Sequence, residues 1–147
     1  MTVRFYLVRH GRAEARHPAG DAARHLLPEG RDAFAAFARA VGPELRLARI
    51  ATSPFARAAE TAGILSEATG APVDQDPELS SGASPGRALL RHGLALGERA
   101  ALVGHNPEIA EAVALAAGRQ VEVPPGTIAA VDADGGAFRL AWTRSPA

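Results

Sequence analysis

Residues 5–14 read FYLVRHGRAE, and the strand they predict is the point from which the rest of the fold can be worked out. The run that opens this stretch is apolar, with aromatic and β-branched side chains, which is typical of a buried strand over residues 3–9. The run then breaks into Arg9, His10 and Gly11, which have nothing to bury. Glycine permits a sharp turn that frees the histidine at the strand end. Because the neighbouring arginine disfavours an imidazolium, we expect His10 to be neutral and nucleophilic near pH 7.

Strands and helices alternate along the rest of the chain. The polar residues 11–27 predict a loop. The patterns that follow predict a helix over 28–43 that stops at Gly42-Pro43, a strand over 47–52, and a helix from Pro54 to about Thr69 with Ser53 as its N-cap. After these we expect a weak strand within 72–79, a helix from Ser84-Pro85 to Gly97 and a strand over 99–104. The last elements are a helix after Asn106-Pro107 that ends at Gly118 and a hairpin over 127–143 that turns at 134–136.

This order of elements predicts an α/β fold. We expect a three-layer α/β/α sandwich with a mostly parallel central sheet, helices on both faces and an antiparallel C-terminal hairpin. The length of 147 residues suits one domain over residues 1–147, and no repeat or linker divides it.

The composition narrows the classes of function. Sixteen basic residues balance sixteen acidic ones, so no overall field attracts nucleic acid or an anionic membrane. The absence of cysteine excludes disulfides, thiolate catalysis and cysteine zinc sites. No apolar run approaches the roughly 20 residues of a membrane span, and the start lacks a signal-peptide pattern, so we expect a cytoplasmic protein.

Unusual polar residues follow three of the predicted strands. They are Arg9-His10-Gly11, then Ser53-Pro54 with Arg57, and finally Gly104-His105-Asn106-Pro107. In open α/β sheets, ligands bind beyond the carboxyl ends of the strands. We therefore expect two histidines and two arginines to converge on a cationic pocket that has no carboxylate of its own and takes phosphate or sulfate.

Each of these residues also has a simpler interpretation. Arg57 lies near the start of a helix, where a cation is unfavourable unless an anion binds there; the alternative is that it only pairs with Glu60 or Glu67 on the helix surface. A histidine placed like His105 often bonds backbone at a turn. The tripeptide Arg-His-Gly alone should occur by chance in about one such chain in twenty.

Taken together, the stretches LVRHGRAE, TSPFARAAETA and LVGHNP resemble the histidine phosphatase superfamily, which has the phosphoglycerate-mutase-like fold. The short chain, the segment DAARHLLPEGRDA and the terminal hairpin look most like the SixA-like phosphohistidine phosphatases. The resemblance implies that His10 is the nucleophile and that Arg9, Arg57 and His105 bind and stabilise the phosphoryl oxygens. No metal or other cofactor is implied, because the basic residues supply the positive charge.

Several further residues are expected near the pocket. Gly11 and Arg16 are predicted to contact substrate, and the other polar residues of the first loop that could border the site are Arg12, His17, Arg24 and His25. The fifth histidine, His92, is expected to face solvent from a helix.

The choice of substrate depends on a general acid. Family members that cleave phosphate esters usually carry an acidic residue beyond the third strand, where this chain has Ser81. Asp76, Glu78 and Glu14 remain candidates, and the alternative for Asp76 and Glu78 is that they are solvated loop carboxylates. A missing acid favours phosphohistidine, whose imidazole leaves readily once it is protonated. The short connections favour an open site that a protein surface can reach.

The sequence therefore predicts a monomeric, metal-independent phosphatase that removes a phosphoryl group from phosphohistidine on a protein. Two alternatives stay open. The first is a phosphomonoesterase for a small metabolite such as a sugar phosphate or nucleotide. The second, less favoured, is an inactive phosphate-binding module.

Overall fold

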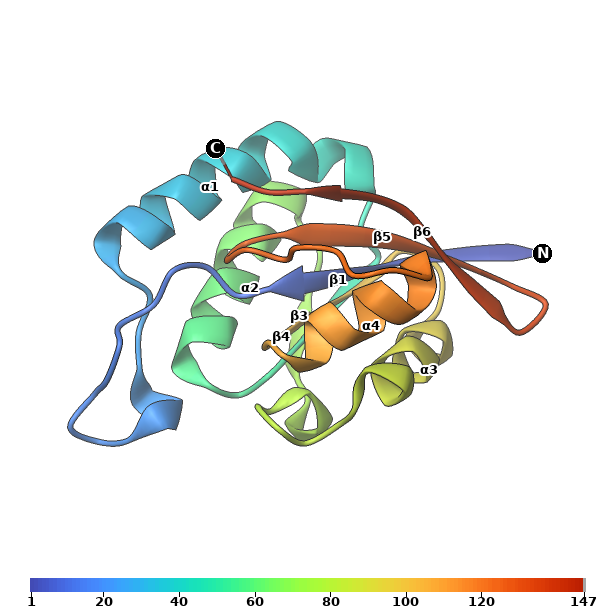
Figure 1. Cartoon of the computed structure of the whole chain (residues 1–147). Helices are drawn as coiled ribbons and strands as arrows, with labels where there is room; N and C mark the ends of the chain where they lie inside the picture. Colours follow the sequence, from blue (N-terminus) through green and yellow to red (C-terminus); the bar gives the residue numbers. More distant parts are fainter. Residues whose placement is uncertain (147) are drawn as a thin grey trace.

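A mixed six-stranded sheet runs through the part of the chain that the structure describes, residues 1–146 (Figure 1). The structure is a computed structural model. Its elements in chain order are β1 (Thr2–Arg9), the 3-10 helix η1 (Asp21–Ala23), α1 (Pro28–Leu45), β2 (Arg49–Thr52), α2 (Ala56–Thr69), β3 (Val73–Gln75), the 3-10 helix η2 (Pro77–Leu79), α3 (Gly86–Leu96), β4 (Ala100–Gly104), α4 (Glu108–Ala117), β5 (Ile128–Asp134) and β6 (Ala137–Arg144).

The strand order β3-β2-β4-β1-β5-β6 confirms the predicted fold class. Strands β1 to β4 are parallel, while β5 pairs antiparallel with β1 and then turns back into β6. In this register Arg9 lies opposite Gly104, and Thr52 lies opposite Val103. The residues that follow β1, β2 and β4 therefore emerge side by side at one edge of the sheet.

Two separate cores cover the two faces of the sheet. In β1, Phe5 and Leu7 face the core that α3 and α4 close, whereas Tyr6 and Val8 face the core that α1 and α2 close. All four side chains are at most 1% exposed. A strand that is buried on both faces carries a continuous apolar run, and the apolar run of residues 5–8 therefore correctly predicted a buried strand.

Helix α1 extends past the predicted stop at Gly42-Pro43 and ends at Leu45. A proline removes only one backbone donor, and tertiary contacts outweigh that loss here. Leu45 is 1% exposed, and its carbonyl accepts a hydrogen bond from the Tyr6 hydroxyl. The next residue, Arg46, is the C-cap and adopts a left-handed conformation with φ 51°.

Helix α2 begins at Ala56, two residues after the predicted start, and its N-cap is Phe55 rather than Ser53. The Ser53 hydroxyl accepts a hydrogen bond from the Phe55 backbone N–H in the turn before the helix. The third strand is also shorter than predicted, since β3 has three residues and η2 follows it. No helix in residues 1–146 has the length and apolar character that crossing a bilayer requires.

The close packing of α3 on β1 leads to a stability prediction. A β-carbon added to Gly93 in α3 would overlap the ring of Phe5, whereas one added to Gly63 in α2 would meet no atom within 4 Å. We expect Gly93→Ala to lower the free energy of unfolding by about 1–3 kcal/mol because the core is overpacked. Gly63→Ala should instead raise it by up to about 1 kcal/mol through helix propensity. Urea unfolding of both variants checks this, and equal midpoints would contradict the packing.

Candidate active site

His10 lies directly after β1 with its ring held in one orientation. Its Nδ1 lies 2.7 Å from the Gly11 carbonyl oxygen, which can only accept, so Nδ1 carries the hydrogen of the neutral ring. The lone pair is therefore on Nε2, which accepts a hydrogen bond from Arg57 Nε at 3.3 Å. The backbone N–H of Gly11 donates to the Thr61 hydroxyl and fixes the turn.

Burial and positive charge keep the two motif histidines neutral. The pKa of His10 is lowered to about 4, first by burial and then by the charges of Arg57 and Arg9. The pKa of His105 is lowered to about 3, again mainly by burial. The sequence predicted a neutral His10 from the neighbouring arginine alone, while the structure shows that burial is the larger cause.

His105, after β4, lies against His10. The two ring centroids are 5.3 Å apart. Its Nε2 lies 2.8 Å from the Ser53 hydroxyl, and when that hydroxyl donates, Nδ1 carries the ring hydrogen. Nδ1 is buried and has no partner among the described residues. Within the described residues the ring of His105 therefore does not bond backbone, and in the tautomer with hydrogen on Nδ1 this N–H is left without a partner.

Two arginines border the same space. Arg9 donates from Nη1 to the Val123 carbonyl at 2.9 Å, while its buried Nε has no partner in residues 1–146. Arg57 reaches in from the first turn of α2, and its side chain is 4% exposed. Its ion pair is with Asp21, so the interpretation in which it pairs with Glu60 or Glu67 is wrong.

The prediction of a pocket without a carboxylate is wrong as well. Asp21, in η1, accepts from Arg57 Nη2 at 3.1 Å through its carboxylate and from Nη1 at 2.7 Å through its carbonyl. The other carboxylate oxygen accepts from Arg24 at 2.8 Å. The i, i+3 spacing of Asp21 and Arg24 was the one local signal for this contact, because the segment is polar and its pattern predicts a loop.

A cavity of about 320 Å³ opens above His10. Among its lining residues are Arg9, His10, Gly11, Arg12, Arg24 and Glu29. Glu29, at the start of α1, is a second acidic residue that the sequence analysis missed, because it was read only as part of a helix start.

The remaining residues that were expected at the border lie elsewhere. Arg16 is exposed and lies outside this cavity lining. His17 and His25 stack against each other with ring centroids 5.5 Å apart, and His25 pairs with Glu60.

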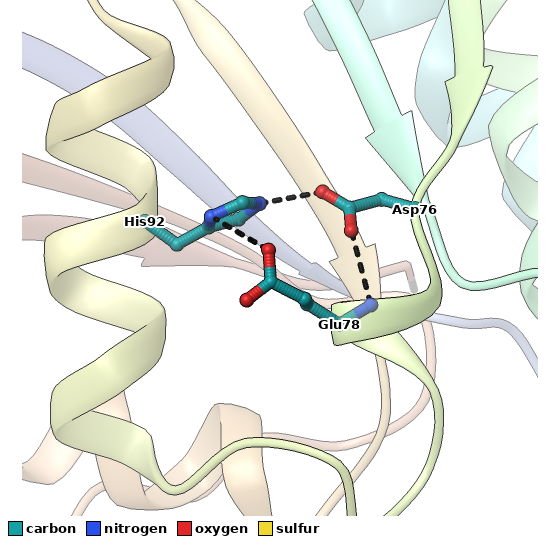
Figure 2. Close-up of side chains that lie close together, drawn as sticks. All are labelled: Asp76, Glu78 and His92. Atoms are coloured by element: carbon teal, nitrogen blue, oxygen red, sulfur yellow. Dashed lines mark hydrogen bonds and ion pairs between the residues drawn. The ribbon is translucent and has the colours of Figure 1, made fainter.

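The candidate acids after the third strand are engaged elsewhere (Figure 2). Asp76 Oδ2 lies 2.5 Å from His92 Nε2, and Glu78 Oε2 lies 3.9 Å from Nδ1 on the other side of the ring. His92 is thus half-buried and does not simply face solvent. Asp76, Glu78 and His92 each place one atom that could bind a metal ion within 4.8 Å of the others. Both carboxylate oxygens of Asp76 are already hydrogen-bonded, however, one to His92 and one to the Glu78 N–H. Glu14 accepts from the His25 N–H at 2.7 Å.

The fold and this edge of the sheet define an α/β protein in which two buried, neutral histidines and two arginines lie together after neighbouring parallel strands. The sequence model of the histidine phosphatase superfamily (branch 1) matches residues 5–81, more than half of the chain. The chain therefore belongs to the histidine phosphatase superfamily, and membership supports phosphatase activity. No curated protein matches it in sequence.

Solved structures share the whole fold. A protein histidine phosphatase SixA complexed with tungstate superposes with a TM-score of 0.87 at 24% identity, covering 98% of this chain and 97% of that one. A provisionally assigned phosphohistidine phosphatase SixA from Agrobacterium tumefaciens gives 0.85 at 23% identity, with 98% of each chain covered. A mycobacterial glucosyl-3-phosphoglycerate phosphatase complexed with VO3 gives 0.75 at 18% identity, covering 99% and 100%. At these identities the likeness is one of fold.

The lowered pKa values predict how stability depends on pH. His10 and His105 titrate at about 4 and about 3 when folded, against 6.5 for the ordinary side chain. Below pH 6.5 the unfolded chain therefore binds more protons than the folded chain. As the pH falls from 6.5 to the folded-state pKa of each histidine, that histidine lowers the free energy of unfolding by about 1.4 kcal/mol per pH unit. His10→Gln should show a shallower loss between pH 7.5 and 5 in urea unfolding. A variant as steep as the parent would contradict the neutral, buried imidazole.

Proposed function

We propose that the chain is a metal-independent phosphatase that removes a phosphoryl group from phosphohistidine on a protein, through a covalent phosphohistidine on His10. One observation carries this proposal. His10 is buried and neutral with its lone pair on Nε2, and two buried nitrogens of neighbouring side chains, Arg9 Nε and His105 Nδ1, have no partner in residues 1–146. An anion is the ligand that such donors lack.

In the first step, His10 Nε2 attacks phosphorus, and the bond between phosphorus and the leaving imidazole nitrogen breaks with its electron pair on that nitrogen. The protonated form of the substrate ring leaves as neutral imidazole, so no acid is required. His10 becomes cationic, and its Nδ1–H bond to the Gly11 carbonyl strengthens as that charge develops.

In the second step, water attacks phosphorus and the bond to His10 Nε2 breaks with its electron pair on Nε2, which returns His10 to the neutral form. Both protons of the water stay on the product, which leaves as dihydrogen phosphate. Arg9, Arg57 and His105 hold the phosphoryl oxygens throughout and stabilise their charge. They supply the positive charge that a metal ion supplies in other phosphoryl-transfer sites.

The comparisons support this ligand class. A neighbour of the same fold holds tungstate, a tetrahedral oxyanion like phosphate, and two neighbours carry the name SixA. The positions of Asp76 and Glu78 also support a phosphoramidate, since both acidic side chains pack on His92 rather than on His10.

A phosphomonoesterase for a small metabolite is the second candidate. Glu29 lines the cavity that contains His10, and a carboxylic acid there is the group that a poor alkoxide leaving group needs. The neighbour named glucosyl-3-phosphoglycerate phosphatase acts on such an ester by its name.

Replacement of the nucleophile tests the mechanism. His10→Ala should fold, with turnover reduced below detection because no group remains to accept the phosphoryl group. The unmodified protein, quenched during turnover of a radiolabelled substrate, should carry an acid-labile, base-stable phosphate at position 10. His92→Asn is the control, since it changes a histidine outside the site and should trap the same label. Substantial activity in His10→Ala would contradict the proposal, and phosphate binding without any turnover by the unmodified protein would favour the inactive module.

A comparison of substrates decides between the two phosphatase candidates. We expect kcat/KM for a protein that carries phosphohistidine to exceed that for sugar phosphates and nucleotides by at least about 10-fold, and Glu29→Gln to leave it nearly unchanged. A preference for an ester, lost in Glu29→Gln, would instead establish the small-metabolite phosphatase.

A further inference from the structure

Asp21 differs from the other acidic residues near the site because it bonds two arginines at once. Its two carboxylate oxygens accept from Arg57 at 3.1 Å and from Arg24 at 2.8 Å. Arg24 lines the cavity above His10, and Arg57 contacts His10 itself. The negative charge of Asp21 is therefore within reach of any ligand that these arginines bind.

The exposure of these residues places Asp21 on the outer side of the site. The Asp21 side chain is 57% exposed, whereas that of Arg57 is 4% exposed and His10 is 9% exposed. In an in-line displacement the leaving group departs on the side of phosphorus away from the nucleophile. Because His10 is nearly buried and the Asp21 carboxylate is exposed, we infer that the leaving group departs toward solvent and passes near Asp21.

Other acidic side chains around the site are less suited to act on a leaving group. The Glu14 carboxylate accepts from the His25 N–H, and the Glu60 carboxylate is bonded to Leu26, His25 and Arg31. Glu29 lines the cavity but forms no hydrogen bond or ion pair with either arginine within residues 1–146. Among these acids, only Asp21 bonds both Arg24 and Arg57 through its carboxylate, whereas Glu14 accepts from Arg24 through its backbone carbonyl.

We propose that Asp21 is a specificity-determining residue, whose charge at the mouth of the site disfavours leaving groups that carry a negative charge and favours those that carry an N–H or a positive charge, such as imidazole. This inference rests on the proposed function for the position of the phosphoryl group. Its physical basis is the attraction or repulsion between Asp21 and the part of the substrate that lies outside the phosphoryl pocket.

Two small phosphate esters isolate this effect, because glycerol 3-phosphate and 3-phosphoglycerate differ by one carboxylate. We would measure the Kd of each by calorimetry for the unmodified protein and for Asp21→Asn. Removal of the Asp21 charge should tighten 3-phosphoglycerate about 3- to 10-fold more than glycerol 3-phosphate, as expected for two charges separated by several ångströms near a protein surface. In the same variant, kcat/KM for a phosphohistidine peptide should fall relative to that for the esters.

Three further variants identify the cause. Asp21→Glu keeps the charge and should retain the parental ratio of the two Kd values. Asp74→Asn removes one charge from exposed β3 and should leave that ratio unchanged. A ratio that stays constant in Asp21→Asn, or that shifts only in Glu29→Gln, would overturn the inference. A purely structural role for Asp21 would change both esters alike.

The Kd ratio is also independent of turnover. If the unmodified protein binds both esters but does not hydrolyse phosphohistidine, the proposed function fails while the role of Asp21 is still decided by the ratio. If turnover is as proposed and the ratio does not move, only the role of Asp21 fails.

Discussion

The hydrogen bond between His10 Nδ1 and the Gly11 carbonyl is the contact on which the site depends. It places the ring hydrogen on one nitrogen and leaves the lone pair on the other, which faces Arg57. A freely rotating imidazole would present either nitrogen to the pocket. The turn that makes this bond possible is in turn fixed by Thr61 and by the His10 N–H, which donates to Gly104 of the neighbouring strand. A nucleophile placed by backbone on two strands keeps its orientation when substrate leaves.

The parallel register of the sheet provides the second half of the site. Because β1, β2 and β4 end together, residues distant in the chain emerge at one edge, and the ring of His105 comes to lie 5.3 Å from that of His10. Ser53, which follows β2, then holds His105 through its hydroxyl. Each strand end thus contributes one part of a single hydrogen-bonded arrangement, and the helices on the two faces keep it in place.

The sequence predicted what is encoded in consecutive residues and missed what depends on packing. The first strand and its Arg-His-Gly end were predicted because their pattern lies within ten neighbouring residues. The predicted end of α1 at Gly42-Pro43 was wrong because Leu45 packs in the core, and a local rule for proline takes no account of such packing. The prediction that His92 faces solvent was wrong for a similar reason, since its contact with Asp76 joins two segments that are distant in the sequence. Asp21 was missed because its partner Arg57 lies on a distant helix.

The contact between Asp21 and Arg57 also reconciles stability with anion binding. A guanidinium that is 4% exposed is costly to bury without a counter-charge, and the carboxylate and carbonyl of Asp21 provide one. Arg9 Nε and His105 Nδ1 have no hydrogen-bond partner among the described residues, so under the proposed function both are available to phosphoryl oxygens. The pairing that holds Arg57 in place therefore does not use these two nitrogens. Under the role inferred for Asp21, the charge that holds Arg57 also acts on whatever is attached to the phosphoryl group.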